Sequence, residues 1–354
     1  MIKLEFDHQT FSLQKYGGIS RYFCDLLRGI NLYYSEEFDA SIEAYFSSNM
    51  YLHDINQTVN FGIDSPKLQF VLNEILYKIS TPVFKPKPDI IHSTYFYEGF
   101  KRSSKNSVMT FYDCIPERYP EYFNSEKVFA QKKKAIEKQD LIIAISRSTA
   151  NDIMEIYGVP NDRIRVVHLS APKLVKSGKK HVAGDYILFV GHRGRYKNFD
   201  KFLLAVSRSS YIKDNYKVVC FGGGAFTSDE KLRFKALGFG PEDIIHAGED
   251  DAILADLYSG SSLFVFPSLF EGFGIPLLEA FANGAKVCCS NIDAFIEVCG
   301  ECAFYFDPKD VDHIMSVMER ALDCQNLSLE THFETKFNMK KMTDETIYVY
   351  RELV

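Results

Sequence analysis

Several common signatures are missing from this chain of 354 residues. It has no P-loop sequence G-x-x-x-x-G-K-[ST], no G-x-S-x-G nucleophile motif and no H-E-x-x-H zinc motif. These absences argue against the commonest nucleotide hydrolases, serine hydrolases and metalloproteases. Glycines at 222–224 follow an apolar run, but Thr227 stands where the third glycine of a dinucleotide-binding fingerprint is needed. A nicotinamide site therefore has little support.

Long apolar segments are also missing. No run of about 18 apolar residues occurs, and the first eleven residues are too polar for a signal peptide. The net charge of −6 argues against nucleic acid as the main partner. We therefore expect a soluble cytoplasmic protein. Lys132–Lys134 and the "KPKP" sequence at 85–88 leave two interpretations open, a peripheral membrane contact and a solvated helix face.

The eight cysteines are scattered along the chain and no secretory signal precedes them, so thiols are expected. Cys299 and Cys302 have the spacing of a redox or zinc motif, but no second C-x-x-C pair accompanies them. We interpret them as core cysteines and predict no metal site.

Short apolar runs alternate with longer amphipathic segments along the whole chain. Alternation of this kind predicts an α/β protein with parallel sheets covered on both faces. Apolar spacing also predicts a helix over residues 68–79. A basic, glycine-containing stretch at 172–185 separates two such series, so we predict domains at 1–171 and 186–334 joined by this linker. The predicted strands are 2–6, 41–46, 89–93, 107–112, 140–146, 163–169, 186–191, 217–223, 243–248, 262–268, 286–290 and 303–307.

The sequence "PSLFEGFGIPLLEAFANG" at 267–284 places two glutamates around a Gly-x-Gly turn. Gly272, Gly274 and Pro276 predict a loop that carries Glu271 and a helix that starts near Ile275 or Pro276 and carries Glu279. Unpaired amides in the first helical turn, at Leu277 and Leu278, would suit a phosphate.

A cluster of cations, Arg193, Arg195 and Lys197, follows the strand predicted at 186–191. Positive charge beside a helix N-terminus fits a diphosphate. A solvated basic loop is the alternative.

The segment 267–308 resembles the Glu-x7-Glu region of the retaining glycosyltransferases of family 4, which have the two-domain GT-B fold. The resemblance extends to "ILFVGHRGRYKNF", "AISRSTANDIMEIYGVPNDRIRVVHLS", "VMTFYDCIPERYP" and "QKYGGISRYF". It implies two doubly wound Rossmann-like domains facing a cleft, with the acceptor on the N-terminal side. It also implies that a C-terminal helix at about 335–354 returns to the first domain.

The resemblance assigns roles to individual residues. Glu279 would accept hydrogen bonds from the ribose, Glu271 from the transferred sugar, and Lys197 would contact the donor diphosphate. Arg193 matches the family arginine, but His192 stands where many relatives have that arginine, so the choice between Arg193 and Arg195 stays open. The remaining donor-side matches are Gly17, Gly18, Phe273, Gly274, Ile275, Leu277 and Leu278, and the acceptor or sugar side comprises Tyr112, Asp113 and His92.

The implied reaction is transfer of a hexose from a nucleoside diphosphate sugar to a saccharide or lipid-linked saccharide hydroxyl, with retention, in surface-polysaccharide synthesis. We expect GDP-mannose as the donor, with a UDP-hexose as the alternative. No cofactor is expected, and fixed cations would make the transfer independent of metal. Two other classes are the alternatives: a sugar-nucleotide epimerase or phosphorylase of the same fold, and a non-catalytic carbohydrate-binding protein.

Overall fold

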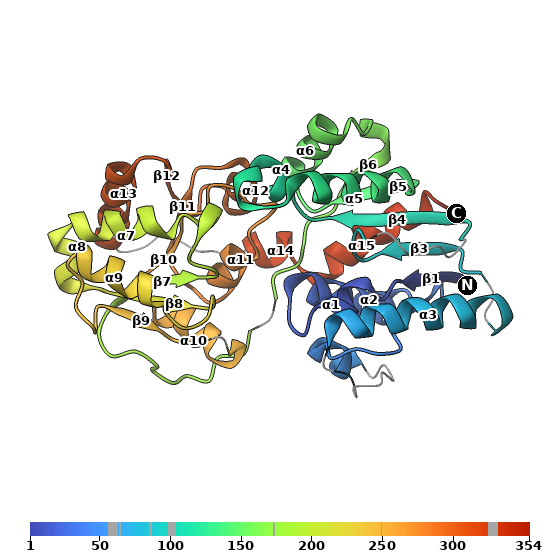
Figure 1. Ribbon diagram of the computed structural model, residues 1–354, viewed down its shortest axis with the longest axis horizontal. Coiled ribbons are helices and arrows are strands. Elements are labelled where there is room, and N and C mark those ends of the chain that lie inside the picture. The colour runs from blue at the N-terminus through green and yellow to red at the C-terminus, as the bar shows by residue number, and fades with distance from the viewer. Residues whose placement is uncertain are drawn as a thin grey trace. The chain divides into compact units, whose positions relative to one another are not determined.

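The computed structural model describes residues 1–55, 63, 65–84, 87–97, 104–172, 174–248, 250–324 and 332–354. It divides into two compact units, one formed by Met1–Ser170 with Phe337–Val354 and the other by Ala171–Lys336. Each unit is built on a parallel sheet of six strands with helices packed against it (Figure 1).

The first unit has strand order β2-β1-β3-β4-β5-β6. In such a sheet the strand order reverses between β1 and β3, and ligands of doubly wound folds bind at that switch point. The strands are β1 (Ile2–Phe6), β2 (Phe38–Ile42), β3 (Ile90–Ser93), β4 (Asn106–Phe111), β5 (Leu141–Ala144) and β6 (Ile164–Val166). The helices are α1 (Gln9–Leu13), α2 (Gly18–Tyr33), α3 (Pro66–Phe84), α4 (Ile115–Arg118), α5 (Ser125–Glu137), α6 (Arg147–Tyr157) and, from the end of the chain, α15 (Met339–Arg351).

The second unit has strand order β12-β11-β10-β7-β8-β9. Its switch point lies between β7 and β10, which pair directly. The strands are β7 (Tyr186–Val190), β8 (Lys217–Phe221), β9 (Ile244–His246), β10 (Leu263–Phe266), β11 (Val287–Ser290) and β12 (Phe304–Phe306). The helices are α7 (Phe199–Arg208), α8 (Ser210–Asn215), α9 (Ser228–Ala236), α10 (Asp251–Gly260), α11 (Ile275–Ala282), α12 (Asp293–Cys299), α13 (Val311–Asp323) and α14 (His332–Lys336).

The predicted fold class is confirmed, and every predicted strand has a counterpart. Runs that are apolar at every position form strands buried on both faces, as in β7, where all five residues are buried. The prediction at 41–46 was the least accurate, because β2 already begins at Phe38 and ends at Ile42. Each unit has its own core, one around Phe189, Phe199 and Phe202 and the other around Phe111 and Ile142.

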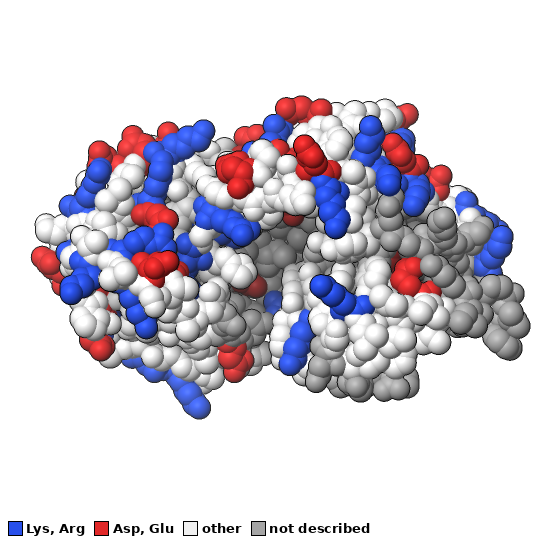
Figure 2. All heavy atoms as spheres, viewed as in Figure 1, with Lys and Arg blue, Asp and Glu red and all other residues white. Residues whose placement is uncertain are grey.

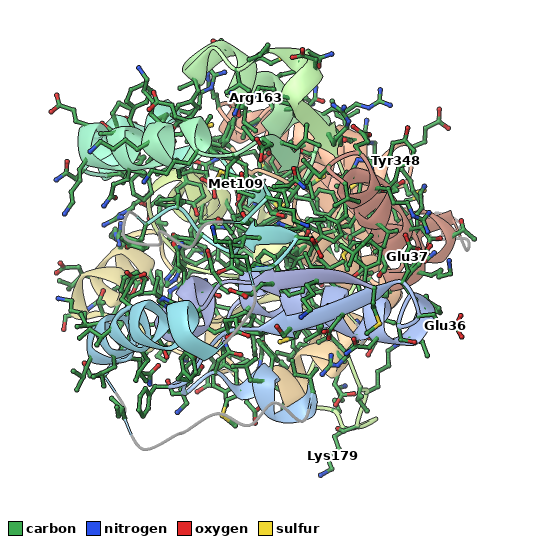
Figure 3. The ribbon with its side chains drawn as sticks, turned by 90° about the vertical axis from the view of Figure 1, so that its right-hand side faces the viewer. Glu36, Glu37, Met109, Arg163, Lys179 and Tyr348 are labelled. Carbon is green, nitrogen blue, oxygen red and sulfur yellow. The ribbon has the colours of Figure 1, made fainter. Side chains whose placement is uncertain are left out.

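The last helix, α15, is part of the first unit and packs along α2. Ile347 and Tyr350 are fully buried, and Arg351 donates from Nε to Glu37 Oε1 over 2.8 Å. Figure 3 labels Glu37, the partner of Arg351, and Tyr348, an exposed residue of α15.

The basic stretch predicted as a linker is attached to the second unit. The carboxylate of Asp256 in α10 accepts hydrogen bonds from Ser177 N, Ser177 Oγ and Gly178 N over 3.2, 2.5 and 2.9 Å, and His181 Nε2 lies 3.0 Å away. The bond from Ser177 and the contact with His181 lower the pKa of Asp256 to about 2. This part of the stretch is therefore anchored at Asp256, while Lys179 is exposed (Figure 3).

Candidate functional site

Lys197 and Glu271 meet at the switch point of the second unit. Lys197 lies in the loop after β7, and Glu271 lies in the loop after β10. Lys197 Nζ donates to Glu271 Oε1 over 2.6 Å, and the two side chains are only 15% and 12% exposed. A second bond, from Leu269 N to Tyr196 O over 2.7 Å, ties the same two loops together. The topology thus brings the predicted lysine and glutamate together.

The loop with Glu271 ends at Gly274, which directly precedes α11. Gly274 has φ 110°, and a Cβ there would lie 2.9 Å from Leu277 Cδ1 and 3.1 Å from Phe295 Cε1, so the position requires glycine. The helix starts at Ile275, as predicted. The Leu277 amide donates to Gly274 O over 2.9 Å, so its predicted role as an unpaired phosphate donor is wrong in this conformation. The corresponding role of Leu278 stays a prediction.

Glu279 lies inside α11 and is only 6% exposed. Tyr258 of α10 donates its hydroxyl hydrogen to Glu279 Oε2 over 3.0 Å. This bond fixes the direction of the carboxylate, because the Tyr258 side chain is itself fully buried. Sequence reasoning missed Tyr258, since nothing in its local sequence marks it as a partner of a glutamate 21 residues away.

Arg193 does not have the phosphate role that was predicted for it. Its side chain is 3% exposed, and Nε donates to Glu230 Oε1 over 2.8 Å. Nη1 and Nη2 donate to the carbonyls of Gly222 and Gly224, each over 2.8 Å. These bonds direct the guanidinium toward the interior of the unit.

The glycines that resembled part of a dinucleotide fingerprint explain this arrangement. Gly222, Gly223 and Gly224 have φ 82°, 74° and 73° and turn their carbonyls toward Arg193. A Cβ on Gly223 would lie 3.0 Å from Gly191 O and 3.1 Å from Arg193 Nη1. The loop therefore binds the buried guanidinium of Arg193.

Arg195 was the alternative to Arg193 in the sequence prediction. It is exposed and adopts φ 58°.

In the first unit, His92 is a core residue. It is fully buried, with Nδ1 2.6 Å from Tyr350 Oη and Nε2 2.8 Å from Thr110 Oγ1. The rings of Phe6 and Phe23 pack against it. Burial lowers the pKa of His92 to about 3, so the imidazole is neutral at physiological pH. Its predicted place on the acceptor side is wrong.

Tyr112 and Asp113 also make local contacts. The Tyr112 hydroxyl donates to Thr94 O over 3.2 Å, and burial raises the pKa of Tyr112 well above 10. Asp113 Oδ1 accepts from Ile115 N over 3.0 Å, a local turn directly before α4. Their roles toward a sugar remain predictions.

The glycine pair before α2 has a similar local explanation. Gly17 leaves room for the side chain of Gln14, because a Cβ on Gly17 would lie 2.3 Å from Gln14 Oε1. That oxygen accepts from Ser20 N over 3.3 Å in the first turn of the helix. Gly18 opens the helix and is exposed. Their role toward a donor stays a prediction.

Comparison with known proteins identifies the family. Residues 171–337 match the family model of glycosyl transferases group 1, and residues 51–170 match that of glycosyltransferase family 4. The chain belongs to the family 4 glycosyltransferases. This confirms the resemblance seen in the sequence motifs.

Two relatives and one solved structure show which known proteins this glycosyltransferase is similar to. The serotype-specific mannosyltransferase WbdA of Escherichia coli is 32% identical over 266 residues, which cover 66% of this chain but only 32% of WbdA. The O-antigen chain mannosyltransferase B of Escherichia coli is 28% identical over 288 residues, 75% of each chain. The structure of Anabaena HepE in complex with UDP-glucose shares the fold, with a TM-score of 0.74 at 13% identity over 99% of this chain and 100% of that chain.

The glycosyltransferase has a second polar cluster, which sequence reasoning missed, at the switch point of its first unit. Asp7 follows β1 and Thr94 follows β3, and Asp7 Oδ1 accepts from Thr94 N over 3.0 Å and Thr94 Oγ1 over 2.5 Å. Gln9 donates to Asp7 Oδ2 over 2.9 Å and accepts from Tyr97 N over 2.8 Å. Burial raises the pKa of Asp7. The signal available in the sequence was a polar run, "DHQT", directly after the first strand.

The lysine cluster of the glycosyltransferase on α5 is less basic at the surface than its sequence suggests. Lys132 is buried and donates to Asp113 O and Glu117 Oε2 over 2.8 and 3.1 Å. The exposed residues around it include acids as well as lysines: Lys127, Lys133, Lys134, Lys138, Glu121, Glu126, Glu137 and Asp140. On the face shown in Figure 2, side chains of both signs are interspersed over both units. In the described part of the chain, no helix combines the length and apolar composition needed to cross a membrane.

Two further acids of the glycosyltransferase, Asp310 and Asp312, have an Asp-x-Asp spacing. Asp310 Oδ1 accepts from Asp312 N and His313 N over 3.0 and 3.1 Å, which caps α13. Asp312 pairs with Arg208 over 2.7 Å.

The cysteine pair has the burial of core residues only in part. Cys299 is buried, as expected of a core cysteine, while Cys302 is partly exposed.

Proposed function

We propose that this chain transfers a hexose, with mannose favoured, from a nucleoside diphosphate sugar to a hydroxyl of a saccharide or lipid-linked saccharide acceptor. Transfer with retention, on the cytoplasmic side and in surface-polysaccharide synthesis, is part of the proposal. The names of WbdA and mannosyltransferase B support mannose and O-antigen. The observation that carries the proposal is the Lys197–Glu271 pair at the switch point of the second unit.

Lys197 would stabilise the charge that grows on the leaving diphosphate. Its ammonium has three N–H donors, and the bond to Glu271 uses one, so the others can serve phosphate oxygens. Because the side chain is 15% exposed, its field is screened less than that of a surface lysine. Arg195 is the second cation that we assign to the diphosphate, because Arg193 is engaged with Glu230 and the loop carbonyls.

The two glutamates would orient the donor. An ionised carboxylate only accepts hydrogen bonds and can take two hydroxyl donors, which suits vicinal hydroxyls of a sugar. We assign Glu271 to the transferred sugar and Glu279 to the ribose. The bond from Tyr258 holds the Glu279 carboxylate in place before a donor binds. Such preorganisation lowers the entropic cost of ordering the side chain when the donor binds.

Substitution of the site residues tests the assignment. Lys197→Ala and Glu279→Ala each remove a charge-assisted contact of roughly 1.5–3 kcal/mol, so donor use should fall about 10–150-fold. Lys201→Ala is the matched control, because Lys201 is a partly exposed lysine of α7 and donates only to Lys309 O among the bonds described. Transfer kinetics like those of the wild type in both site variants would refute the assignment.

The donor can be identified by thermal shift with GDP, UDP, ADP and dTDP. A site ligand at 100 times its dissociation constant adds about 2.7 kcal/mol to the free energy of unfolding. We expect GDP to give the largest shift, and a larger shift with UDP would favour a UDP-hexose. Consumption of the donor without an acceptor would instead indicate an epimerase or phosphorylase.

We also propose that the transfer needs no metal, because Lys197 and Arg195 would supply the positive charge that a magnesium ion supplies elsewhere. Activity should therefore persist in excess EDTA. A complete loss that Mg²⁺ restores would overturn this part of the proposal.

A further inference from the structure

Helix α3 presents apolar side chains on its exposed face. Leu68, Val71 and Ile75 follow one another at intervals of three and four residues, so they lie on one side of the helix. They are 48%, 51% and 47% exposed. Polar residues occupy the opposite side, where Gln69 is 1% and Asn73 0% exposed. The usual orientation of an amphipathic helix is thus inverted here.

Polar contacts on the inner side fix this orientation. Asn73 Oδ1 accepts from Tyr45 N and Phe46 N, each over 2.9 Å, and its Nδ2 donates to Ser12 Oγ over 2.8 Å. Glu74 Oε1 lies 3.3 Å from His8 Nε2. Rotating the helix to bury the apolar face would leave these buried polar groups without their partners, which costs about 1–3 kcal/mol for each group.

The charge of this segment indicates what covers the apolar face. Residues 66–88 contain four lysines, Lys67, Lys78, Lys85 and Lys87, and a single acid, Glu74, which contacts His8. The whole chain, in contrast, carries a net charge of −6. An apolar helix face accompanied by an excess of lysines is complementary to an anionic lipid surface. The exposed part of α5 and its flanks lacks both features, since the exposed lysines there are balanced by an equal number of exposed acids.

We propose that the exposed face of α3, formed by Leu68, Val71 and Ile75, is a membrane-contact surface that enters the interface of an anionic bilayer. Lys67 and Lys87, the exposed lysines near the two ends of α3, would contact the lipid headgroups. Because a lipid-linked acceptor would lie in such a bilayer, this inference deepens the proposed function and rests on it for that link alone. Binding to lipid can be measured without donor or acceptor, so the two proposals can fail separately.

The test is co-sedimentation with vesicles that contain phosphatidylglycerol, compared with vesicles of phosphatidylcholine alone. The wild-type protein should bind the anionic vesicles. The variant with Leu68→Ser, Val71→Ser and Ile75→Ser should bind at least about tenfold more weakly, because it keeps every lysine but loses the apolar contact. The matched control is Leu232→Ser, since Leu232 is a leucine of α9 that is 67% exposed.

The chain contains no tryptophan, which allows a direct readout of insertion. Tryptophan fluorescence of a Val71→Trp variant should shift to shorter wavelength with anionic vesicles, whereas that of a Leu232→Trp variant should not. Equal vesicle binding by the triple variant and the wild type, or no binding by either, would overturn the proposal. Loss of binding only on replacing Lys127, Lys133 and Lys134 would also overturn it, in favour of α5. A dimer of the wild type that the triple variant abolishes would assign the face to a second copy of the chain instead.

Discussion

Arg193 and Arg195 stand two positions apart, yet their surroundings differ completely. Arg193 is bound to Glu230 and to backbone carbonyls, and its side chain is 3% exposed, whereas Arg195 is exposed. Burial raises the pKa of Glu230, but the bonds from Arg193 and Thr227 outweigh this effect, so the pKa is lowered overall. Glu230 therefore stays ionised and depends on Arg193 for its partner.

We predict that Arg193→Met destabilises the protein by about 3 kcal/mol or more, because it leaves a partly buried carboxylate unpaired. Arg195→Met should leave the melting temperature unchanged but weaken binding of the nucleoside diphosphate about tenfold. Arg233→Met controls for the loss of an arginine, since Arg233 pairs with Asp200 at the surface. Thermal melting and titration calorimetry measure the two effects. A stable Arg193→Met protein with weakened nucleotide binding would return the phosphate role to Arg193.

At the residue scale, the sequence singled out Lys197, Glu271 and Glu279, whose roles toward a donor stay predictions, but it misplaced Arg193, which makes internal contacts. Glu271 and Glu279 stand together in one dense motif, whereas Lys197 lies 74 residues before Glu271, and chain topology brings the two side chains together. The ligands of Arg193 are mostly backbone carbonyls, which every residue carries and which therefore leave no signature. His92 was misplaced for a similar reason, because its partner Tyr350 is 258 residues away.

At the scale of elements, the prediction was good where burial alone determines structure. Strands such as β7 were found because every position is apolar. The helix at 68–79 was also found, but the apolar spacing of its sequence could not say which side faces the rest of the unit. That choice depends on Asn73 and its contacts with the chain near Tyr45 and Phe46, which are non-local.

His92 joins β3, β4 and α15, and it gives this junction a pH dependence. Its pKa is about 3 in the folded state and about 6.5 when unfolded. Between these values the unfolded chain binds the extra proton, so stability rises with pH from about 3 to 6.5 and is lost on acidification. The slope due to His92 should be about 1.4 kcal/mol per pH unit.

Urea unfolding between pH 4.5 and 7.5 measures this slope, and His92→Gln should remove the contribution of His92. His192→Gln, which changes an exposed histidine, serves as the control. Identical pH profiles for His92→Gln and the wild type would show that burial does not depress the pKa of His92.

At the scale of the whole molecule, the two units have separate cores, and the end of the chain belongs to the first. Lys197, which we assign to the donor diphosphate, lies in the second unit. Glu271 and Glu279, which we assign to the sugar and the ribose of the donor, lie in the same unit. A perturbation of one unit should therefore leave the other unaffected, provided that each unfolds as its own cooperative unit.

Scanning calorimetry should accordingly show two transitions. Tyr350→Phe removes the hydroxyl that contacts His92, at a cost of about 1–2 kcal/mol, and should lower the first unit's transition by roughly 2–4 °C per kcal/mol. Tyr348→Phe on the same helix is the control, because Tyr348 is 65% exposed. A saturating nucleoside diphosphate should raise only the other transition, because the diphosphate site is assigned to the second unit. If Tyr350→Phe and the nucleotide moved the same transition, either the units unfold together or the donor site is not confined to the second unit. Adding Lys197→Ala would then separate these explanations, since it reduces the nucleotide shift only if the site is the one assigned here.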